Sequence, residues 1–321
     1  MASYHLSASV IGRSDGRSAV AAAAYRAGAV LTDPDTGTVH DYRRKGGVVS
    51  AFVLTPDGAP DWAQDRAALW SAVHARETRK NSQLAREVRL ALPLELDADA
   101  RADLVRDWVR RECVERGMIA DVAIHDPTPG PDRDQNPHAH VLLTMRPLDP
   151  GQPDGWSKGK ARDWNAKETL EGWRASWAEA QNAALEQAGA SARVDHRSLA
   201  DQREAAIDAG DDLLAEVLDR PPEPRLGVAA GGIDARAGAT VSDRGVALAD
   251  ARAHRSALLE AFDRARDAAR SVAEAMRQAT RPLSDLSALR GFMRSKSPEA
   301  EPSMPEPPKG TTLDDDDPTP A

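Results

Sequence analysis

Apolar and polar residues alternate in several short stretches of the chain. This pattern predicts β-strands, because successive side chains of a strand point to opposite faces of a sheet. The stretches lie at residues 3–11, 84–93, 118–125 and 138–144. The last two are separated by a segment rich in proline, glycine and aspartate, which is typical of a turn. We therefore expect these two strands to pair as a hairpin.

Other stretches repeat apolar residues every three or four positions, which predicts amphipathic helices. Ser18 is a suitable N-cap and Gly28 a suitable C-terminal stop for a short alanine-rich helix between them. Longer helices are expected over residues 60–80, 97–116, 167–188 and 243–280. The order of these elements predicts an α+β fold, in which helices pack on one side of a mostly antiparallel central sheet. A helical and partly disordered C-terminal tail is expected to follow this fold.

The chain changes in character near residue 200. Residues 1–200 carry a net charge of −2, whereas residues 201–321 are rich in Ala, Arg and Asp and carry −7. We expect a folded domain over 1–200 and a helical accessory region over 201–296, with a Gly/Ala-rich linker at 226–240. Residues 297–321 include seven prolines and a run of four aspartates, and we expect them to be a disordered tail.

The total charge of −9 argues against nucleic-acid binding by the chain as a whole, because affinity for DNA depends on Lys and Arg side chains that neutralise phosphates. A DNA-binding function would have to come from local basic clusters, each of which could equally be a solvated face. The candidates for DNA contact are Arg17, Arg26, Arg43, Arg44, Lys45, Arg79 and Lys80.

The cysteine content of the sequence and its lack of long apolar runs indicate the cellular compartment. Cys113 is the single cysteine, so no internal disulfide can form. No apolar run approaches the roughly 18 residues needed to span a bilayer, and the N-terminus lacks a signal-peptide pattern. The sequence also lacks a phosphate-binding loop of the kind found in ATP-driven motors. We therefore expect a cytoplasmic protein.

Three histidines lie on the two strands of the expected hairpin. His138 and His140 are two residues apart, so both would face the same side of a sheet. His125 ends the preceding strand and would arrive beside them. Histidines on half-buried strands are often packing residues, but three imidazoles with open positions suit a divalent ion used as a Lewis acid. The pattern therefore favours a metal site.

Two further residues are candidates for chemistry. Tyr25 lies on the last turn of the alanine-rich helix, where small neighbours leave its ring prominent, although it could equally be a packing residue. Glu87 lies on the strand at 84–93, where it could orient an imidazole, accept a proton, or form a surface ion pair with Arg89. His196 is a fourth histidine candidate, but a histidine between Asp and Arg in a turn is usually a hydrogen-bonding residue.

Four motifs in order along the chain resemble the MobA/MobL (MobQ-type) plasmid-mobilisation relaxases, which are HUH endonucleases. The resemblance spans about residues 3–200. The motifs are Gly16–Gly28, Leu84–Glu87, Asn136–His140 and Val194–Ser198.

The resemblance implies a relaxase-like fold and a nickase that cuts one DNA strand at an origin of transfer and can reseal it. It implies that Tyr25 is the nucleophile, and that the enzyme forms a 5′-phosphotyrosyl bond with help from Mg²⁺ or Mn²⁺. By the same resemblance, His125, His138 and His140 would bind this metal, and Glu87 would act as a base or as an orienting residue. The implied partners are single-stranded DNA at the origin, relaxosome accessory proteins and a type IV coupling protein.

The chain departs from the family pattern in one place and leaves alternatives open. Similar proteins tend to carry a histidine in the stretch that corresponds to Pro222–Gly227, where this chain has Arg225. Many members are also longer, with fused helicase or primase regions, and we expect neither in this sequence. The alternative functions are a rolling-circle replication initiator, a non-catalytic DNA-binding accessory protein, and a metallohydrolase that acts on small molecules.

Overall fold

A computed structural model describes residues 4–279, apart from 17, 127–135 and 225. Its centre is a five-stranded sheet with the strand order β1-β5-β7-β6-β4, in which every neighbouring pair is antiparallel. The expected hairpin is present, since β6 and β7 are neighbours in this order. The strands are β1 (Leu6–Gly12), β4 (Val48–Leu54), β5 (Gln83–Ala91), β6 (Ala120–His125) and β7 (His138–Thr144).

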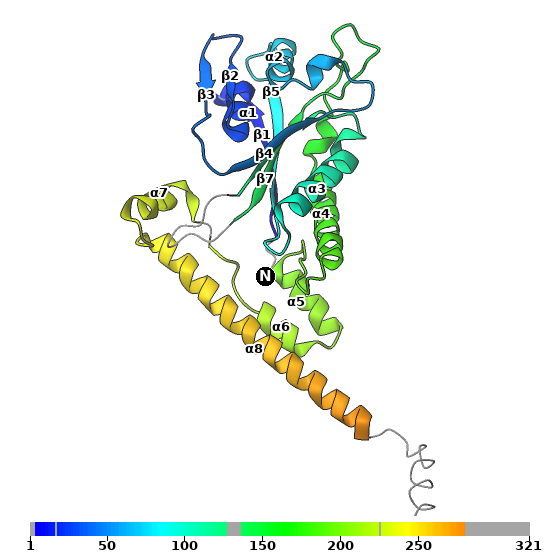
Figure 1. The fold of residues 1–321 in the computed structure, drawn as a ribbon, viewed down its shortest axis with the longest axis vertical. Coiled ribbons are helices and arrows are strands. Elements are labelled where there is room, and N and C mark those ends of the chain that lie inside the picture. The colour runs from blue at the N-terminus through cyan, green and yellow to red at the C-terminus, as the bar shows by residue number, and fades with distance from the viewer. Residues whose placement is uncertain (1–3, 17, 127–135, 225, 280–321) are drawn as a thin grey trace, which may run out of the picture. The chain divides into compact units, whose positions relative to one another are not determined.

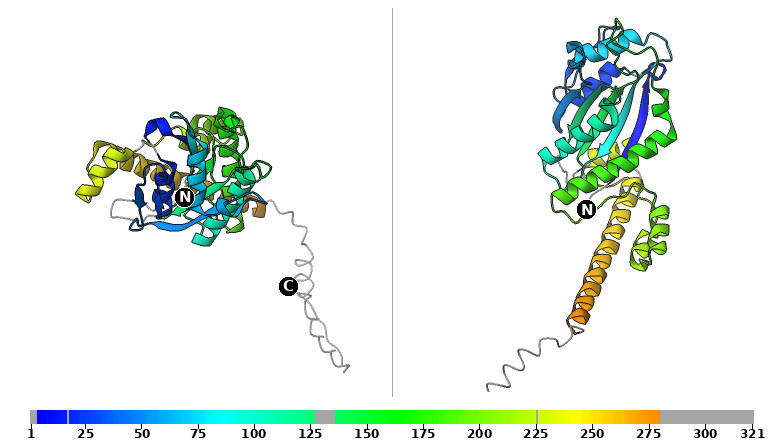
Figure 2. Two further views of the ribbon diagram at one scale, coloured as in Figure 1. Left: turned by 90° about the horizontal axis from the view of Figure 1, so that it is seen from above. Right: turned by 90° about the vertical axis from the view of Figure 1, so that its right-hand side faces the viewer.

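Helices cover both faces of this sheet, so the expectation that they pack on one side was wrong (Figure 1). Helices α3 (Ala98–Val109) and α4 (Lys167–Gln187) pack on one face, which the right-hand view of Figure 2 turns toward the viewer. Helices α1 (Ala19–Ala27) and α2 (Arg66–Arg76) pack on the other face. The inner strands β5, β6 and β7 are therefore buried on both sides, which hides the simple alternation that a one-sided sheet shows.

The core beneath α3 and α4 is built around indole rings. Trp108 of α3 packs edge-to-face against Trp177 and Trp173 of α4, with ring centroids 5.4 and 6.4 Å apart. All three rings are at most 2% exposed. These contacts hold the two helices on one face and leave the opposite face of β5, β6 and β7 to carry polar side chains.

Helix α1 forms as the sequence predicts. The Ser18 hydroxyl accepts a hydrogen bond from the Ala21 amide, and Gly28 ends the helix in the left-handed conformation with φ of 61°. Ala19, Ala23 and Ala24 are fully buried, because methyl side chains let the helix lie close to the sheet. The expected helix at residues 60–80 is shorter, since its true N-cap is Asp65 and α2 begins at Arg66.

The other predicted helices match the structure closely. Helix α3 is followed directly by a π-helical turn, so the helical segment expected over 97–116 is present with a change of winding. The short turns are the 3-10 turns Arg13–Asp15, Asp61–Ala63 and Arg162–Asn165 and the π-helical turn Arg110–Val114.

Three strands between α1 and α2 were not predicted. Strands β2 (Val30–Thr32) and β3 (Val39–Asp41) form a separate antiparallel hairpin, and β4 is an edge of the main sheet. The first two are only three residues long, so they carry too little pattern to be recognised. The β4 stretch is apolar and β-branched after a pair of glycines, which is a signal that could have found it.

The C-terminal region is helical. Residues inside the expected Gly/Ala-rich linker form helix α7, and the long predicted helix over 243–280 corresponds to α8. The chain divides into units of residues 1–259 and 260–321. No helix in the described part of the chain is long and apolar enough to cross a membrane, and the tail expected at 297–321 lies outside the described residues. The helices are α5 (Leu199–Asp208), α6 (Asp212–Leu218), α7 (Gly227–Ala237) and α8 (Asp243–Ala279).

Candidate metal and nucleophile site

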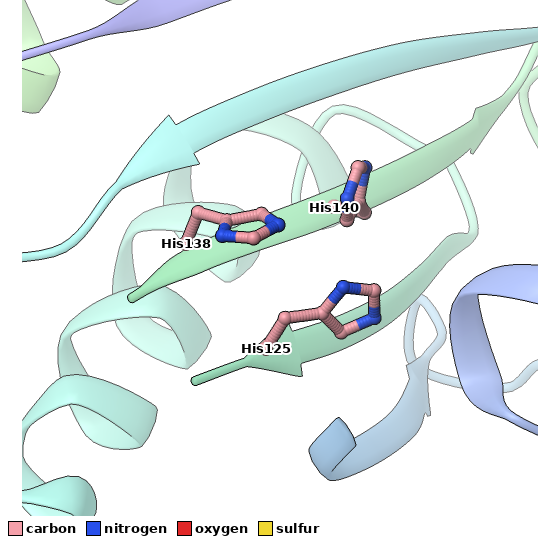
Figure 3. Close-up of side chains that lie close together, drawn as sticks. All are labelled: His125, His138 and His140. Atoms are coloured by element: carbon pink, nitrogen blue, oxygen red, sulfur yellow. The ribbon is translucent and has the colours of Figure 1, made fainter. Parts of the chain in front are cut away.

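Three imidazoles project from the same face of β6 and β7, on the side of the sheet that α1 covers (Figure 3). His125 pairs directly across the hairpin with His138, and His140 is the next residue on that face of β7. One nitrogen of each ring lies within 4.8 Å of a nitrogen of each other ring. The hairpin register thus brings the three predicted ligands together.

Hydrogen bonds leave one nitrogen of each ring with a free lone pair. His125 donates from Nε2 to the Arg26 carbonyl at 2.7 Å, and His138 donates from Nδ1 to the Asn136 carbonyl at 2.8 Å. His140 donates from Nδ1 to Oε1 of Glu87 at 2.6 Å. A metal-binding histidine typically uses its second nitrogen in this way, since the bond selects the tautomer and orients the ring. The three residues therefore fit a divalent metal ion.

Burial favours the neutral form of His125 and His138, which is the form that binds metal. Removal from water lowers the pKa of His125 to about 4, and the positive charge of Lys45 adds to this effect. Burial also lowers the pKa of His138. A neutral imidazole keeps the lone pair that a metal ion requires, so these two residues are in the form that can bind one.

Glu87, on β5, lies beside His140 of β7 and is 7% exposed. The Arg26 guanidinium donates from Nε and Nη2 to its two oxygens, at 2.8 and 2.6 Å. Burial alone would raise the pKa of Glu87, but the hydrogen bonds from His140 and Arg26 outweigh it and lower the pKa to about 2. The ion pair considered for Glu87 with Arg89 is thus replaced by a buried pair with Arg26, and so acidic a carboxyl is a weak base.

Tyr25 and Arg26 are neighbours on the last turn of α1, yet their side chains differ in environment. Arg26 points inward to Glu87, and its carbonyl accepts the hydrogen bond from His125. Tyr25 is 49% exposed and borders a hollow of about 330 Å³ next to α1. One helical turn therefore joins the imidazole cluster to the tyrosine.

The hairpin of β2 and β3 flanks helix α1. Its Asp33 carboxylate accepts hydrogen bonds from the Ser18 hydroxyl at 2.7 Å and from the amides of Asp35 and Thr36. Ser18 is also the N-cap of α1, so the same side chain starts the helix and holds the hairpin. The strand β3 then leads to Tyr42, whose ring meets that of Tyr25 edge-on at 5.2 Å between centroids.

The structure separates the predicted DNA-contact residues into different groups. Arg26 is committed to Glu87 and is mostly buried, so it is not available as the surface phosphate contact that the sequence suggested. Arg43 pairs with Asp41 at 2.7 Å. The other candidates that the structure describes are exposed or half-exposed, and Arg17 lies outside the described residues. The exposed or half-exposed candidates are Arg44, Lys45, Arg79 and Lys80.

Sequence reasoning missed the partner of Glu87 and the contacts of Lys45. Arg26 and Glu87 are 61 residues apart, and nothing local in either segment indicates the pair. The only available signal was a carboxylate on a buried strand, which requires a nearby cation. His196 lies outside the imidazole cluster, and its Nδ1 is 3.9 Å from Oδ1 of Asp195, which is too long for a hydrogen bond.

Comparison with known proteins identifies relatives for most of the domain. A model of the MobA/MobL family matches residues 17–210, which include Tyr25, Glu87 and the three histidines. The mobilization protein MobL of Acidithiobacillus ferridurans is 38% identical over 266 residues, which are 74% of this chain and 65% of that protein. The probable conjugal transfer protein TraA of Sinorhizobium fredii (strain NBRC 101917 / NGR234) is 33% identical over 77% of this chain and 23% of that protein. The chain thus spans less than two thirds of the length of either relative.

A solved structure also resembles the chain. It is described as "Molecular Basis of Vancomycin Resistance Transfer in Staphylococcus aureus" and is 35% identical, with a TM-score of 0.56. The likeness covers 61% of this chain and 100% of that chain. The range matched by the family model, residues 17–210, includes strands β4 to β7 and helices α1 to α4.

Proposed function

Because the chain belongs to the MobA/MobL family, we propose that it nicks and rejoins one DNA strand at a plasmid origin of transfer. The family expected from the four sequence motifs is confirmed by the match over residues 17–210. The names of the relatives concern mobilisation and conjugal transfer, which supports a role in moving plasmid DNA between cells. The proposed substrate is single-stranded DNA at the origin, and the proposed partners are relaxosome accessory proteins and a type IV coupling protein.

One observation carries this proposal. The last turn of α1 presents an exposed tyrosine. The next residue, Arg26, accepts a hydrogen bond from His125 with its carbonyl, and its side chain binds Glu87, the partner of His140. A nucleophile therefore lies in a turn that is fastened to a candidate metal site. An accessory protein that only bound DNA would have no use for this connection.

The proposed reaction is a transesterification. The Tyr25 hydroxyl oxygen attacks the scissile phosphorus, the bond from phosphorus to the 3′-oxygen breaks, and the phenolic proton is transferred in net terms to that oxygen. The products are a 5′-phosphotyrosyl bond and a free 3′-hydroxyl. One phosphoester replaces another, so the step is close to balanced in free energy and can run backward to reseal the strand.

The three histidines would hold Mg²⁺ or Mn²⁺, and such an ion supplies Lewis-acid stabilisation of the charge that builds on the phosphate. Glu87 acts in this proposal by orienting His140 rather than as a base. Both of its oxygens are occupied by donors, and its low pKa makes it a poor proton acceptor. Arg26 in turn holds Glu87, and its carbonyl orients His125.

The test is covalent capture of a DNA oligonucleotide that carries the hairpin and nick site of the cognate origin. The wild-type protein with Mn²⁺ should give a protein–DNA adduct on a denaturing gel. Tyr25→Phe removes one oxygen and almost no volume, so it should bind the oligonucleotide and form no adduct. Tyr42→Phe is the matched control, since it removes a hydroxyl from the neighbouring ring, and it should still form the adduct.

An adduct that persists in Tyr25→Phe would assign the nucleophile to another residue. Absence of any metal-dependent cleavage by the wild-type protein would favour the accessory-protein alternative. Cleavage of a replication origin in preference to the transfer origin would favour a rolling-circle initiator, which uses the same chemistry.

A further inference from the structure

A lysine lies against the ring of Tyr25. The ammonium nitrogen of Lys45 is 3.9 Å from the ring centroid, and it also donates a hydrogen bond to the Tyr25 carbonyl at 3.0 Å. The edge-on contact with Tyr42 adds a second neighbour to the same ring. The exposed tyrosine is therefore held by a cation over its face and by an aromatic ring beside it.

The backbone fixes these two side chains relative to α1. Lys45 donates its amide to the Tyr42 carbonyl at 2.9 Å, and Tyr42 donates its own amide to the Ala29 carbonyl at 3.1 Å. Gly28 gives the chain the left-handed conformation, with φ of 61°, that turns it from the end of α1 toward Ala29. The turn over residues 42–45 is thus fastened to the end of the helix that carries Tyr25.

Lys45 differs from the two basic residues before it. Arg43 is paired with Asp41, and Arg44 is exposed. Lys45 is half-buried, and burial lowers its pKa to about 8, with a smaller contribution from the positive charge of Arg26. A partly buried cation beside another cation is unfavourable in itself. Its ammonium group contacts the ring and the carbonyl oxygen of Tyr25.

We infer that Lys45 is a positioning residue for the nucleophile: its ammonium holds the Tyr25 ring and stabilises negative charge that develops on it during attack. This inference rests on the proposed nicking reaction. When the hydroxyl loses its proton, charge spreads from the oxygen into the ring, so the attraction of the ammonium grows. An interaction that strengthens on the way to the transition state raises kcat more than it lowers KM.

The test compares Lys45→Met, Lys45→Arg and the matched control Arg44→Met in the full chain. Each Met variant removes one positive charge from the same turn, but only Lys45→Met removes the cation from the ring. Initial nicking rates are measured with the cognate oligonucleotide at saturating Mn²⁺, and Mn²⁺ affinity and thermal unfolding are measured in parallel. We expect Lys45→Met to lower kcat about tenfold, as the loss of a partly desolvated cation–π contact would.

The expected pattern has three parts. Lys45→Arg should recover most of kcat, both Met variants should raise KM alike, and Mn²⁺ affinity should not fall below that of wild type in any of them. The inference is overturned if Lys45→Met changes KM as Arg44→Met does and leaves kcat intact, because Lys45 would then be a simple DNA contact. It is also overturned if Lys45→Arg is as slow as Lys45→Met. Failure of the wild-type protein to nick would instead refute the proposed function.

Discussion

Replacing Glu87 with glutamine tests whether this residue orients His140 or acts as a base. The change exchanges one oxygen for an amide nitrogen and keeps the volume. In the wild-type structure the two oxygens accept three hydrogen bonds, two from Arg26 and one from His140. Glutamine offers one acceptor oxygen and one donor NH₂ group, so in either orientation its NH₂ faces an N–H of a partner.

The size of the effect follows from which bond is lost. If the amide oxygen faces Arg26, the Nδ1–H of His140 loses its acceptor, and the ring is no longer held in the metal-binding tautomer. If the oxygen faces His140, an N–H of Arg26 is left unpaired in a buried site. In the first orientation, the loss of the acceptor for His140 is expected to weaken metal binding by about 10- to 100-fold. That factor corresponds to about 1.4–2.8 kcal/mol of binding free energy.

The assay is isothermal titration of metal-free protein with Mn²⁺ at neutral pH, alongside the nicking rate. Asp41→Asn is the matched control, since Asp41 is an exposed carboxylate that pairs with Arg43 and makes no hydrogen bond to an imidazole. Thermal unfolding shows whether the variant is folded, because breaking a buried ion pair costs roughly 3–5 kcal/mol of stability. An unchanged Mn²⁺ affinity together with a large loss of rate would refute the orienting role and restore the role of base.

Three further outcomes are expected. His138→Ala should abolish nicking and weaken Mn²⁺ binding sharply in the same titration, and unchanged affinity would reassign the residue to packing. A chain ending at Ala200 should fold, as judged by circular dichroism, and should still nick DNA, because α5 and α6 form their own small apolar cluster. If this shortened chain folds but is inactive, the domain boundary lies further along the chain. The hydrogen bonds of Asp33, which outweigh burial, lower its pKa. Its stabilising effect should therefore be full at neutral pH and fade as the pH falls, so that urea unfolding of wild type and Asp33→Asn should converge in acid.

The sequence determined the features that depend on neighbours along the chain. The two-residue period of a strand places His138 and His140 on one face, and the predicted pairing of their strand with the preceding one places His125 beside them. Ser18 and Gly28 define the ends of α1 in the same local way. These expectations came from backbone geometry within a few residues, and they hold because that geometry is the same in any sheet or helix.

Only the tertiary structure decided which distant groups meet. The strand order places β5 beside β7, so Glu87 lies next to His140, and packing of α1 on that face brings Arg26 to Glu87 across 61 residues. The same packing buries a cation that the sequence suggested for the surface, and the turn after β3 carries Lys45 to Tyr25. No local pattern encodes these contacts, because burial and charge neutralisation act between residues that are close in space and not in sequence.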